Sequence, residues 1–171
     1  MDTIFTILLC DDDQEDAAQM QLALKHCGVP IRLFLARTAD AALGFFAEPL
    51  PFREKNPFPD LVILDLKRPL LNGLEVLTWL RTHSEWDRLP VIILSGSPLG
   101  RDLEDAYHLG ASTYFTRPRT APELLELASL LVFYWSWNRR SESSIRALKE
   151  NCCWRPGNLL SAPEESAKAA I

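Results

Sequence analysis

Acidic residues gather at the ends of two apolar runs of the sequence. Asp11, Asp12 and Asp13 come directly after the run ILLC, and Asp65 comes directly after the run LVIL. Neighbouring carboxylates repel one another unless a cation lies among them. Mg²⁺ suits such a position because it binds one or a few carboxylates together with water and phosphate oxygens. Capping of a following helix explains one of the three adjacent aspartates but not all three, so the pattern favours a magnesium site.

Asp65, Ser95 and Arg117 together indicate phosphoryl transfer. A carboxylate beside bound Mg²⁺ can attack phosphorus and form an aspartyl phosphate. This reaction needs an aligned oxygen, a metal and donors for the phosphoryl oxygens. Ser95 follows the run VIIL and offers a hydroxyl, Gly96 leaves space beside it, and Arg117 offers a fixed positive charge. Asp65 alone would be an ordinary turn residue after a strand. Together with Ser95, Arg117 and the three preceding aspartates, it forms a set that is specific for phosphoryl transfer.

Five short apolar runs predict the strands that position these residues. Three of the runs are continuous rather than alternating, as expected for strands covered by helices on both faces. The predicted strands are Ile4–Cys10, Ile31–Leu35, Leu61–Leu64, Val91–Leu94 and Ser112–Phe115. Because ligands of a parallel α/β sheet bind beyond the carboxyl ends of its strands, we expect the acids, the hydroxyl and the cation to meet there.

Helix signals lie between the predicted strands. Two glycines follow predicted helices and indicate their ends, and two pairs have the spacing of capping boxes. These residues are Gly28, Gly110, Asn72 with Glu75, and Thr120 with Glu123. The alternation of strands and helices predicts an α/β fold with a parallel, doubly wound sheet and right-handed crossovers.

Composition and charge exclude several classes of protein. The 171 residues are about one domain's worth, with 47% apolar and 24% charged residues, as in globular proteins. A net charge of −5 leaves no basic excess for binding nucleic acid or a membrane surface. Asp2 stands where a signal peptide needs positive charge, and the apolar stretch Leu124–Trp137 is too short to span a bilayer. The four cysteines form no repeated CxxC pair. We therefore expect a cytoplasmic protein.

Four motifs of the sequence resemble, in their order and spacing, the receiver domain of two-component response regulators. They are CDDD, LVILDLKRPLLNG, VIILSGS and GASTYFTRP. The resemblance covers roughly Thr3–Asn138 and implies a flavodoxin-like, five-stranded sheet of order 2-1-3-4-5. We predict a receiver domain over residues 1–138 and a tail over residues 139–171. The tail is too short for a second domain, and we expect it to be flexible apart from a short helix around Ile145–Lys149.

The resemblance also implies roles for the site residues. Asp11 and Asp12 match the family's acid pocket and Asp65 its phosphoacceptor, and these three residues bind Mg²⁺ together with the backbone carbonyl of Lys67. A phosphohistidine on a partner kinase supplies the phosphoryl group. Within the family, the approach NPFPDLVILDL and the aromatic end of the last helix resemble single-domain regulators associated with bacterial phytochromes, which implies a bacteriophytochrome-like histidine kinase as partner.

Three further residues complete the comparison with the family. Ser95 matches the residue that hydrogen-bonds the phosphoryl group, and Tyr114 matches the aromatic that changes rotamer as Ser95 moves. Arg117 departs from the family pattern, which has lysine before the proline of the last motif. Arginine is a planar fork that favours two-point contact with a carboxylate or phosphate. Arg117 would therefore either clamp the phosphoryl group or pair with Asp65 and imitate the phosphorylated state.

The last predicted helix, Ala121–Asn138, has more apolar residues than one buried face needs. One stripe has the spacing of a face packed on the sheet and consists of Leu124, Leu127, Leu131 and Trp135. Outside it lie Leu130, Phe133, Tyr134 and Trp137. We predict that this second set forms a homodimer interface with the segment Arg101–Leu109 and the strand Ser112–Phe115. The alternative is that the tail covers it through Trp154.

Two other functions remain as alternatives to the phosphorylated regulator. One is a degenerate receiver that no longer takes phosphate, because Arg117 holds it in one state, and that acts as a constitutive protein-interaction module. The other is a magnesium phosphatase with an aspartate nucleophile on the first strand. Enzymes of that type resemble haloacid dehalogenases and have Asp-x-Asp followed by x-Thr or x-Val, whereas Asp11-x-Asp13 is followed by Gln14-Glu15. We therefore expect a signalling protein that is not an enzyme.

Overall fold

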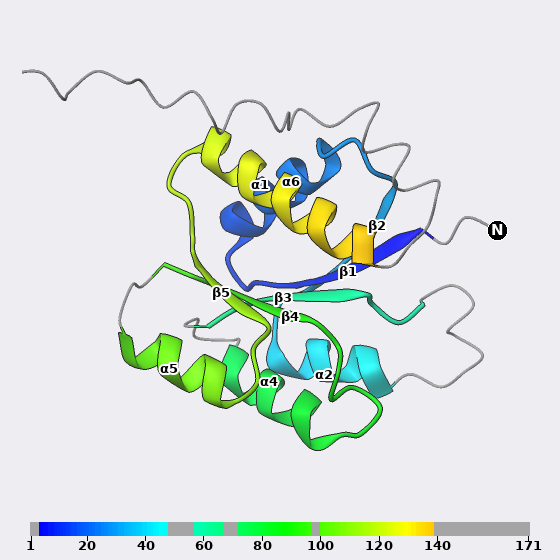
Figure 1. Ribbon diagram of the computed structural model, residues 1–171, viewed down its shortest axis with the longest axis vertical. Coiled ribbons are helices and arrows are strands. Elements are labelled where there is room, and N and C mark those ends of the chain that lie inside the picture. Colours follow the sequence, from blue (N-terminus) through cyan, green and yellow to red (C-terminus); the bar gives the residue numbers. More distant parts are fainter. Residues whose placement is uncertain (1–3, 48–56, 67–71, 97–99, 139–171) are drawn as a thin grey trace, which may run out of the picture.

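The computed structural model describes residues 4–47, 57–66, 72–96 and 100–138. A five-stranded parallel sheet of order β2-β1-β3-β4-β5 forms its middle layer (Figure 1). The strands are β1 (Phe5–Cys10), β2 (Ile31–Ala36), β3 (Leu61–Asp65), β4 (Val91–Ser95) and β5 (Thr113–Thr116). Strand order and direction confirm the predicted doubly wound fold. Asp65 and Ser95 are the last residues of their strands rather than the first residues after them.

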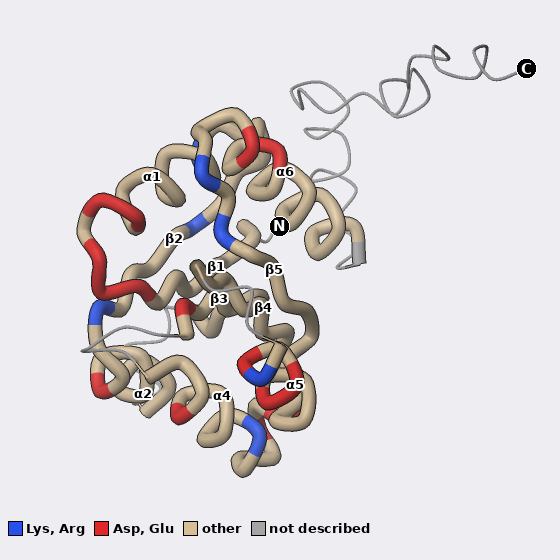
Figure 2. Tube along the Cα trace, turned by 90° about the vertical axis from the view of Figure 1, so that its left-hand side faces the viewer, with Lys and Arg blue, Asp and Glu red and all other residues tan. Residues whose placement is uncertain are grey.

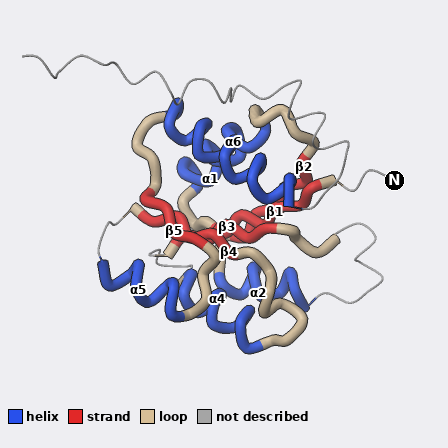
Figure 3. Tube along the Cα trace, viewed as in Figure 1, coloured by secondary structure: helices blue, strands red, loops and turns tan. Residues whose placement is uncertain are grey.

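Helices cover both faces of this sheet (Figure 3). They are α1 (Gln14–Lys25), α2 (Ala39–Ala47), α4 (Gly73–Thr82), α5 (Gly100–His108) and α6 (Ala121–Asn138). α1 and α6 pack on one face, and α2, α4 and α5 pack on the other. None of the helices in the described part of the chain is long and apolar enough to cross a membrane. The predicted tail over residues 139–171 lies outside the described residues.

Burial on both faces explains why the central strands are continuously apolar. Every residue of β1, β3 and β4 is buried. Successive side chains of a strand point to opposite faces, so Ile7 and Ile63 pack in the core beneath α1 and α6, while Leu8 and Leu64 pack in the core beneath α2, α4 and α5. Two apolar layers thus hold the sheet in place and fix the positions of its strand ends.

The helix signals of the sequence are confirmed with one exception. Gly28 and Gly110 have φ values of 71° and 91°, the left-handed conformation that ends a helix at low cost for glycine. The capping box of Thr120 and Glu123 is present, with reciprocal side-chain to backbone hydrogen bonds of 3.3 and 3.4 Å. The box predicted at Asn72 is wrong: Asn72 is the N-cap residue of α4, but its side chain makes no capping hydrogen bond.

The last helix has the two apolar faces expected of it. Leu124, Leu127 and Leu131 are buried against the sheet and α1. Of the apolar residues outside this buried stripe, Leu130, Tyr134 and Trp137 have exposed side chains. Phe133 differs from these three, because it is partly buried and packs against the core beneath α6.

Candidate functional site

Four residues singled out in the sequence converge at the carboxyl edge of the sheet. Asp65 ends β3 and Ser95 ends β4. Asp11 follows β1 directly, and its backbone N–H donates to the carbonyl of Ala36, 3.0 Å away. Arg117 follows β5, and its backbone N–H donates to the carbonyl of Ser95 at 2.8 Å. The parallel register therefore brings two carboxylates, a hydroxyl and a guanidinium to one edge, as the sequence predicts.

Three carboxylates form a cluster at this edge. Asp11, Asp16 and Asp65 each offer one oxygen, and these oxygens lie within 4.8 Å of one another. The side chains of Asp11 and Asp65 are 0% and 4% exposed, whereas that of Asp16 is 29% exposed. Figure 2 shows the run of acidic residues that leads from β1 into α1. We call these three residues the carboxylate cluster.

Asp16 is the member of the cluster that sequence reasoning missed, and Asp12, which was expected there, is half-buried outside it. Asp13 caps α1 by accepting hydrogen bonds from the backbone N–H groups of Glu15 and Asp16, at 2.9 and 3.0 Å. Side chains in a first helical turn point back toward the N-terminus, which carries Asp16 toward the sheet edge. The signal in the sequence is Asp13, because an N-cap at that position places two acidic residues, Glu15 and Asp16, in the first turn of α1.

Arg117 contacts all three members of the carboxylate cluster. Its Nη2 lies 2.6 Å from Oδ2 of Asp11 and 3.0 Å from Oδ2 of Asp65. Its Nη1 lies 3.6 Å from Oδ2 of Asp16. The side chain is 13% exposed, and its buried Nε makes no hydrogen bond to the residues that the structure describes. The guanidinium thus supplies the positive charge that neighbouring buried carboxylates require.

Burial governs the protonation of the groups around Asp11. Removal from water raises the pKa of Asp11 above its usual value, and this outweighs the lowering by the Arg117 charge, by its hydrogen bond and by the N–H of Asp13. The charge of Asp65 raises the pKa of Asp11 further. Next to it, burial and the charge of Asp11 raise the pKa of the Cys10 thiol.

The carboxylate cluster fits a small divalent ion. An octahedral Mg²⁺ holds oxygens at about 2.1 Å, so that neighbouring ligands are roughly 3 Å apart and only opposite ligands are roughly 4.2 Å apart. The three cluster oxygens lie within 4.8 Å of one another, so they would draw closer together to hold one ion. Lys67, whose carbonyl was expected among the ligands, lies outside the described residues.

Gly73 allows the start of α4 to approach Asp65. A Cβ atom added to Gly73 would lie 2.3 Å from the carbonyl oxygen of Asp65 and 3.2 Å from Cα of Leu66. Both neighbours are backbone, so neither can move aside as a flexible side chain would. Sequence reasoning did not single out this glycine, because its role depends on a contact with a strand end rather than on a turn.

Ser95 and Tyr114 lie on neighbouring strands and face the same layer of helices. Ser95 pairs with Thr116 and Ile93 pairs with Tyr114 in the parallel ladder, so the side chains of Ser95 and Tyr114 point to one face of the sheet. Ser95 is buried, and Tyr114 is half-buried against the core beneath α5. The backbone N–H of Tyr114 donates to the hydroxyl of Tyr107 on α5, 3.2 Å away.

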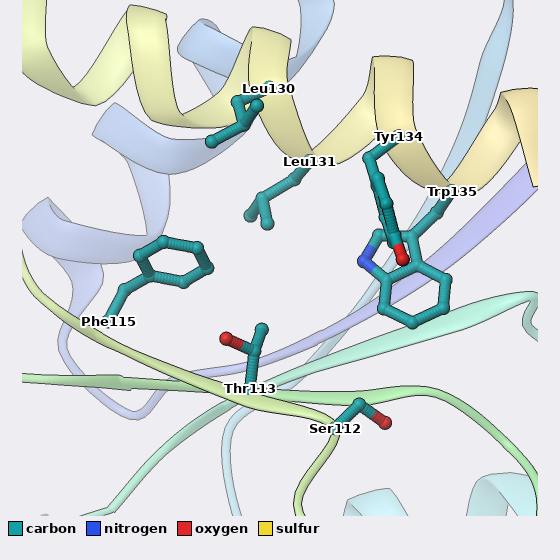
Figure 4. Close-up of a pocket in the computed structure, with 7 residues that line it drawn as sticks. All are labelled: Ser112, Thr113, Phe115, Leu130, Leu131, Tyr134 and Trp135. Atoms are coloured by element: carbon teal, nitrogen blue, oxygen red, sulfur yellow. The ribbon is translucent and has the colours of Figure 1, made fainter.

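A pocket of about 310 Å³ lies between β5 and α6. Figure 4 shows its lining residues, which come from the two elements and the turn before β5 and are Ser112, Thr113, Phe115, Leu130, Leu131, Tyr134 and Trp135. Two of them, Leu130 and Tyr134, are 45% and 55% exposed. Exposed apolar side chains that adjoin one another are typical of surfaces that bind other proteins.

Comparison with known proteins relates this geometry to one family. Residues 7–129 match the model of the response regulator receiver domain. The response regulator Rcp1 of Synechocystis sp. is 30% identical over 129 residues, which are 75% of this chain and 87% of the relative. The crystal structure of Mn²⁺-bound Rcp1 has a TM-score of 0.67 at 29% identity and covers 77% of this chain and 94% of that one. The phosphorylated cyanobacterial phytochrome response regulator RcpA has a TM-score of 0.72 at 26% identity, with coverages of 80% and 96%.

Proposed function

The chain belongs to the response regulator receiver domain family, and from this premise we propose that it is a single-domain response regulator that accepts a phosphoryl group on Asp65 from a phytochrome-type histidine kinase. One observation carries this proposal: Asp65 ends a central strand within a cluster of two further carboxylates and a guanidinium. The relation to Rcp1 and RcpA supports a kinase of the phytochrome type.

Asp65 is the nucleophile in the proposed reaction. One of its carboxylate oxygens attacks the phosphorus of a phosphohistidine on the kinase. The new oxygen–phosphorus bond forms as the phosphorus–nitrogen bond breaks, and the bond electrons return to the imidazole, which takes a proton from water. A divalent ion held by the carboxylate cluster supplies charge neutralisation for the phosphoryl oxygens. That Asp12 and the Lys67 carbonyl also bind the ion stays a prediction.

Ser95 and Arg117 stabilise the product in this proposal. The Ser95 hydroxyl, at the end of the strand next to β3, donates a hydrogen bond to a phosphoryl oxygen. Arg117 has donors on three nitrogens, and a planar fork of this kind suits a phosphate with several oxygens. Its buried Nε makes no hydrogen bond to the described residues, so a donor remains for a phosphoryl oxygen.

We further propose that the surface formed by α5, β5 and α6 reports phosphorylation and forms a homodimer. Movement of Ser95 toward the phosphoryl group would change the packing of Tyr114, whose backbone already contacts Tyr107 of α5. The exposed side chains of Tyr134 and Trp137 adjoin this surface on α6. A symmetric dimer would remove these apolar groups from water.

A second function is favoured by one contact. Arg117 Nη2 lies 3.0 Å from Oδ2 of Asp65, so the positive charge already meets the phosphoacceptor. A stable pair of this kind would block transfer and hold the receiver in one state, as a constitutive interaction module. The two functions differ in whether Asp65 takes phosphate.

Incubation with Mg²⁺ and acetyl phosphate, followed by intact mass measurement, separates the two functions. We expect a phosphoryl adduct on the wild-type chain and none on Asp65→Asn, which keeps the shape of the side chain but weakens its nucleophilicity. Asp40→Asn on the exposed start of α2 is the matched control and should form the adduct. Absence of an adduct on the wild-type chain, with chemical trapping included, would support the constitutive module.

A further inference from the structure

The guanidinium of Arg117 already lies where a cation of this site would lie. Its Nη2 is within hydrogen-bond distance of both Asp11 and Asp65, and its Nη1 is 3.6 Å from Asp16. These are the same three residues whose oxygens could hold a metal ion together. One charged side chain therefore contacts every member of the carboxylate cluster.

We propose that Arg117 is an internal competitor of the divalent ion, so that metal binding requires its guanidinium to leave the carboxylate cluster. This inference rests on the proposed function, which assigns the ion to that cluster. An ion in contact with Asp11 and Asp65 sits about 2.1 Å from each oxygen. It would then lie within a few Å of Nη2, where two positive groups repel strongly in a site with little water.

The structure contains the features that a displaceable guanidinium needs. The backbone of Arg117 is fixed by its hydrogen bond to Ser95, so that only the side chain has to move. That side chain is 13% exposed, and solvent is therefore close. Its Nε makes no hydrogen bond to the described residues, so displacement of the guanidinium breaks no contact of this atom within that part of the chain.

Because the guanidinium and the ion compete, the metal concentration determines which of the two occupies the carboxylate cluster. Without metal, Arg117 neutralises the buried acids and contacts Asp65. With metal, the ion takes over the neutralisation and Arg117 becomes available to the phosphoryl oxygens. Because each divalent ion must displace these contacts, the wild-type site binds metal more weakly than the same carboxylates would without Arg117.

The test is Mn²⁺ binding to the full chain by isothermal titration calorimetry, with three variants beside the wild type. Arg117→Met removes the competing charge at similar length. Arg117→Lys keeps the positive charge but weakens its contacts with the carboxylates, so it distinguishes competition for the cluster from an effect of net charge. A compact and strongly hydrated ammonium cannot reproduce the two-nitrogen fork of arginine, and it leaves the cluster more readily. Arg119→Met removes an equal charge from an exposed residue two positions away and is the matched control.

We expect Mn²⁺ to bind Arg117→Met about tenfold more tightly than wild type or better, since several charge-assisted contacts no longer have to be broken. Arg117→Lys should fall between the two, and Arg119→Met should resemble wild type. Equal affinities for wild type and Arg117→Lys would overturn the proposal, as would equal gains for Arg117→Met and Arg119→Met. If Arg117→Met does not fold, the comparison of wild type with Arg117→Lys decides the matter.

The outcome is separate from that of the proposed function. A gain in Mn²⁺ affinity without any phosphoryl adduct on the wild-type chain would support the competition and remove the phosphoacceptor role. An adduct on the wild-type chain without a gain in affinity would do the reverse.

Discussion

Replacement of Gly73 by alanine tests whether the start of α4 depends on its close approach to Asp65. The added Cβ would lie 2.3 Å from the Asp65 carbonyl oxygen and 3.1 Å from its carbonyl carbon. An ordinary carbon–oxygen contact is about 3.3 Å or longer, so the helix or the strand end must move by roughly 1 Å. Overpacking of this kind costs about 1–3 kcal/mol, and we expect Gly73→Ala to lower the free energy of unfolding by that amount.

Gly44 provides the matched control for this substitution. It lies within α2, is exposed, and a Cβ added there meets nothing within 4 Å. Alanine at such a helical position stabilises by about 0.5–1 kcal/mol. The same chemical change is therefore expected to have opposite signs at the two glycines, with a difference of about 1.5–4 kcal/mol.

Urea unfolding followed by tryptophan fluorescence measures both variants. Phosphorylation of Gly73→Ala by acetyl phosphate should also slow, because the carbonyl that must move belongs to the proposed phosphoacceptor. The reasoning would be refuted if Gly73→Ala were as stable as Gly44→Ala. It would also be refuted if Gly73→Ala lost stability while Asp65 took phosphate at the wild-type rate.

Three further predictions test other contacts, two of them with a control substitution. Arg81→Met should lower the free energy of unfolding by about 2–4 kcal/mol, because Arg81 donates to three main-chain carbonyls at 2.9, 3.2 and 3.1 Å; an unchanged urea midpoint would contradict this. Thr120→Ala should cost about 1 kcal/mol by removing a capping hydrogen bond, and Asn72→Ala should cost clearly less, since Asn72 makes none. Tyr134→Ala should weaken the proposed dimer at least about tenfold in analytical ultracentrifugation, while Leu22→Ala, at an equally exposed site on α1, should leave it unchanged. A dimer constant that does not respond to phosphorylation of the wild-type chain would contradict the proposed switch.

Much of the fold could be predicted because burial leaves a direct mark on sequence. A strand covered on both faces must be apolar throughout, and the runs ILLC, LVIL and VIIL have that property. A helix that ends in a left-handed residue favours glycine, which stands at Gly28 and Gly110. The capping prediction at Asn72 was wrong because residue type and spacing do not determine whether the side chain of the N-cap residue turns toward the free N–H groups of the helix.

The residue types of the site were predictable for a related reason. Polar groups at the end of a buried parallel strand face a shared edge, which is how Asp11, Asp65 and Ser95 could be grouped. Asp16 could not be grouped in this way, because it belongs to a helix rather than to a strand end. Its place in the carboxylate cluster follows from how the capped first turn of α1 is seated against the sheet.

By itself, the sequence determined which segments are buried and which chemical groups stand at their ends, since both depend on residue type and local spacing. Only the tertiary structure decided that Arg117 meets Asp11, 106 residues away, and Asp65, 52 residues away. It also decided that Gly73 lies against a strand end. Such contacts depend on strand order and on the seating of helices against the sheet, which the long-range packing of two apolar layers fixes and which no periodicity along the chain records.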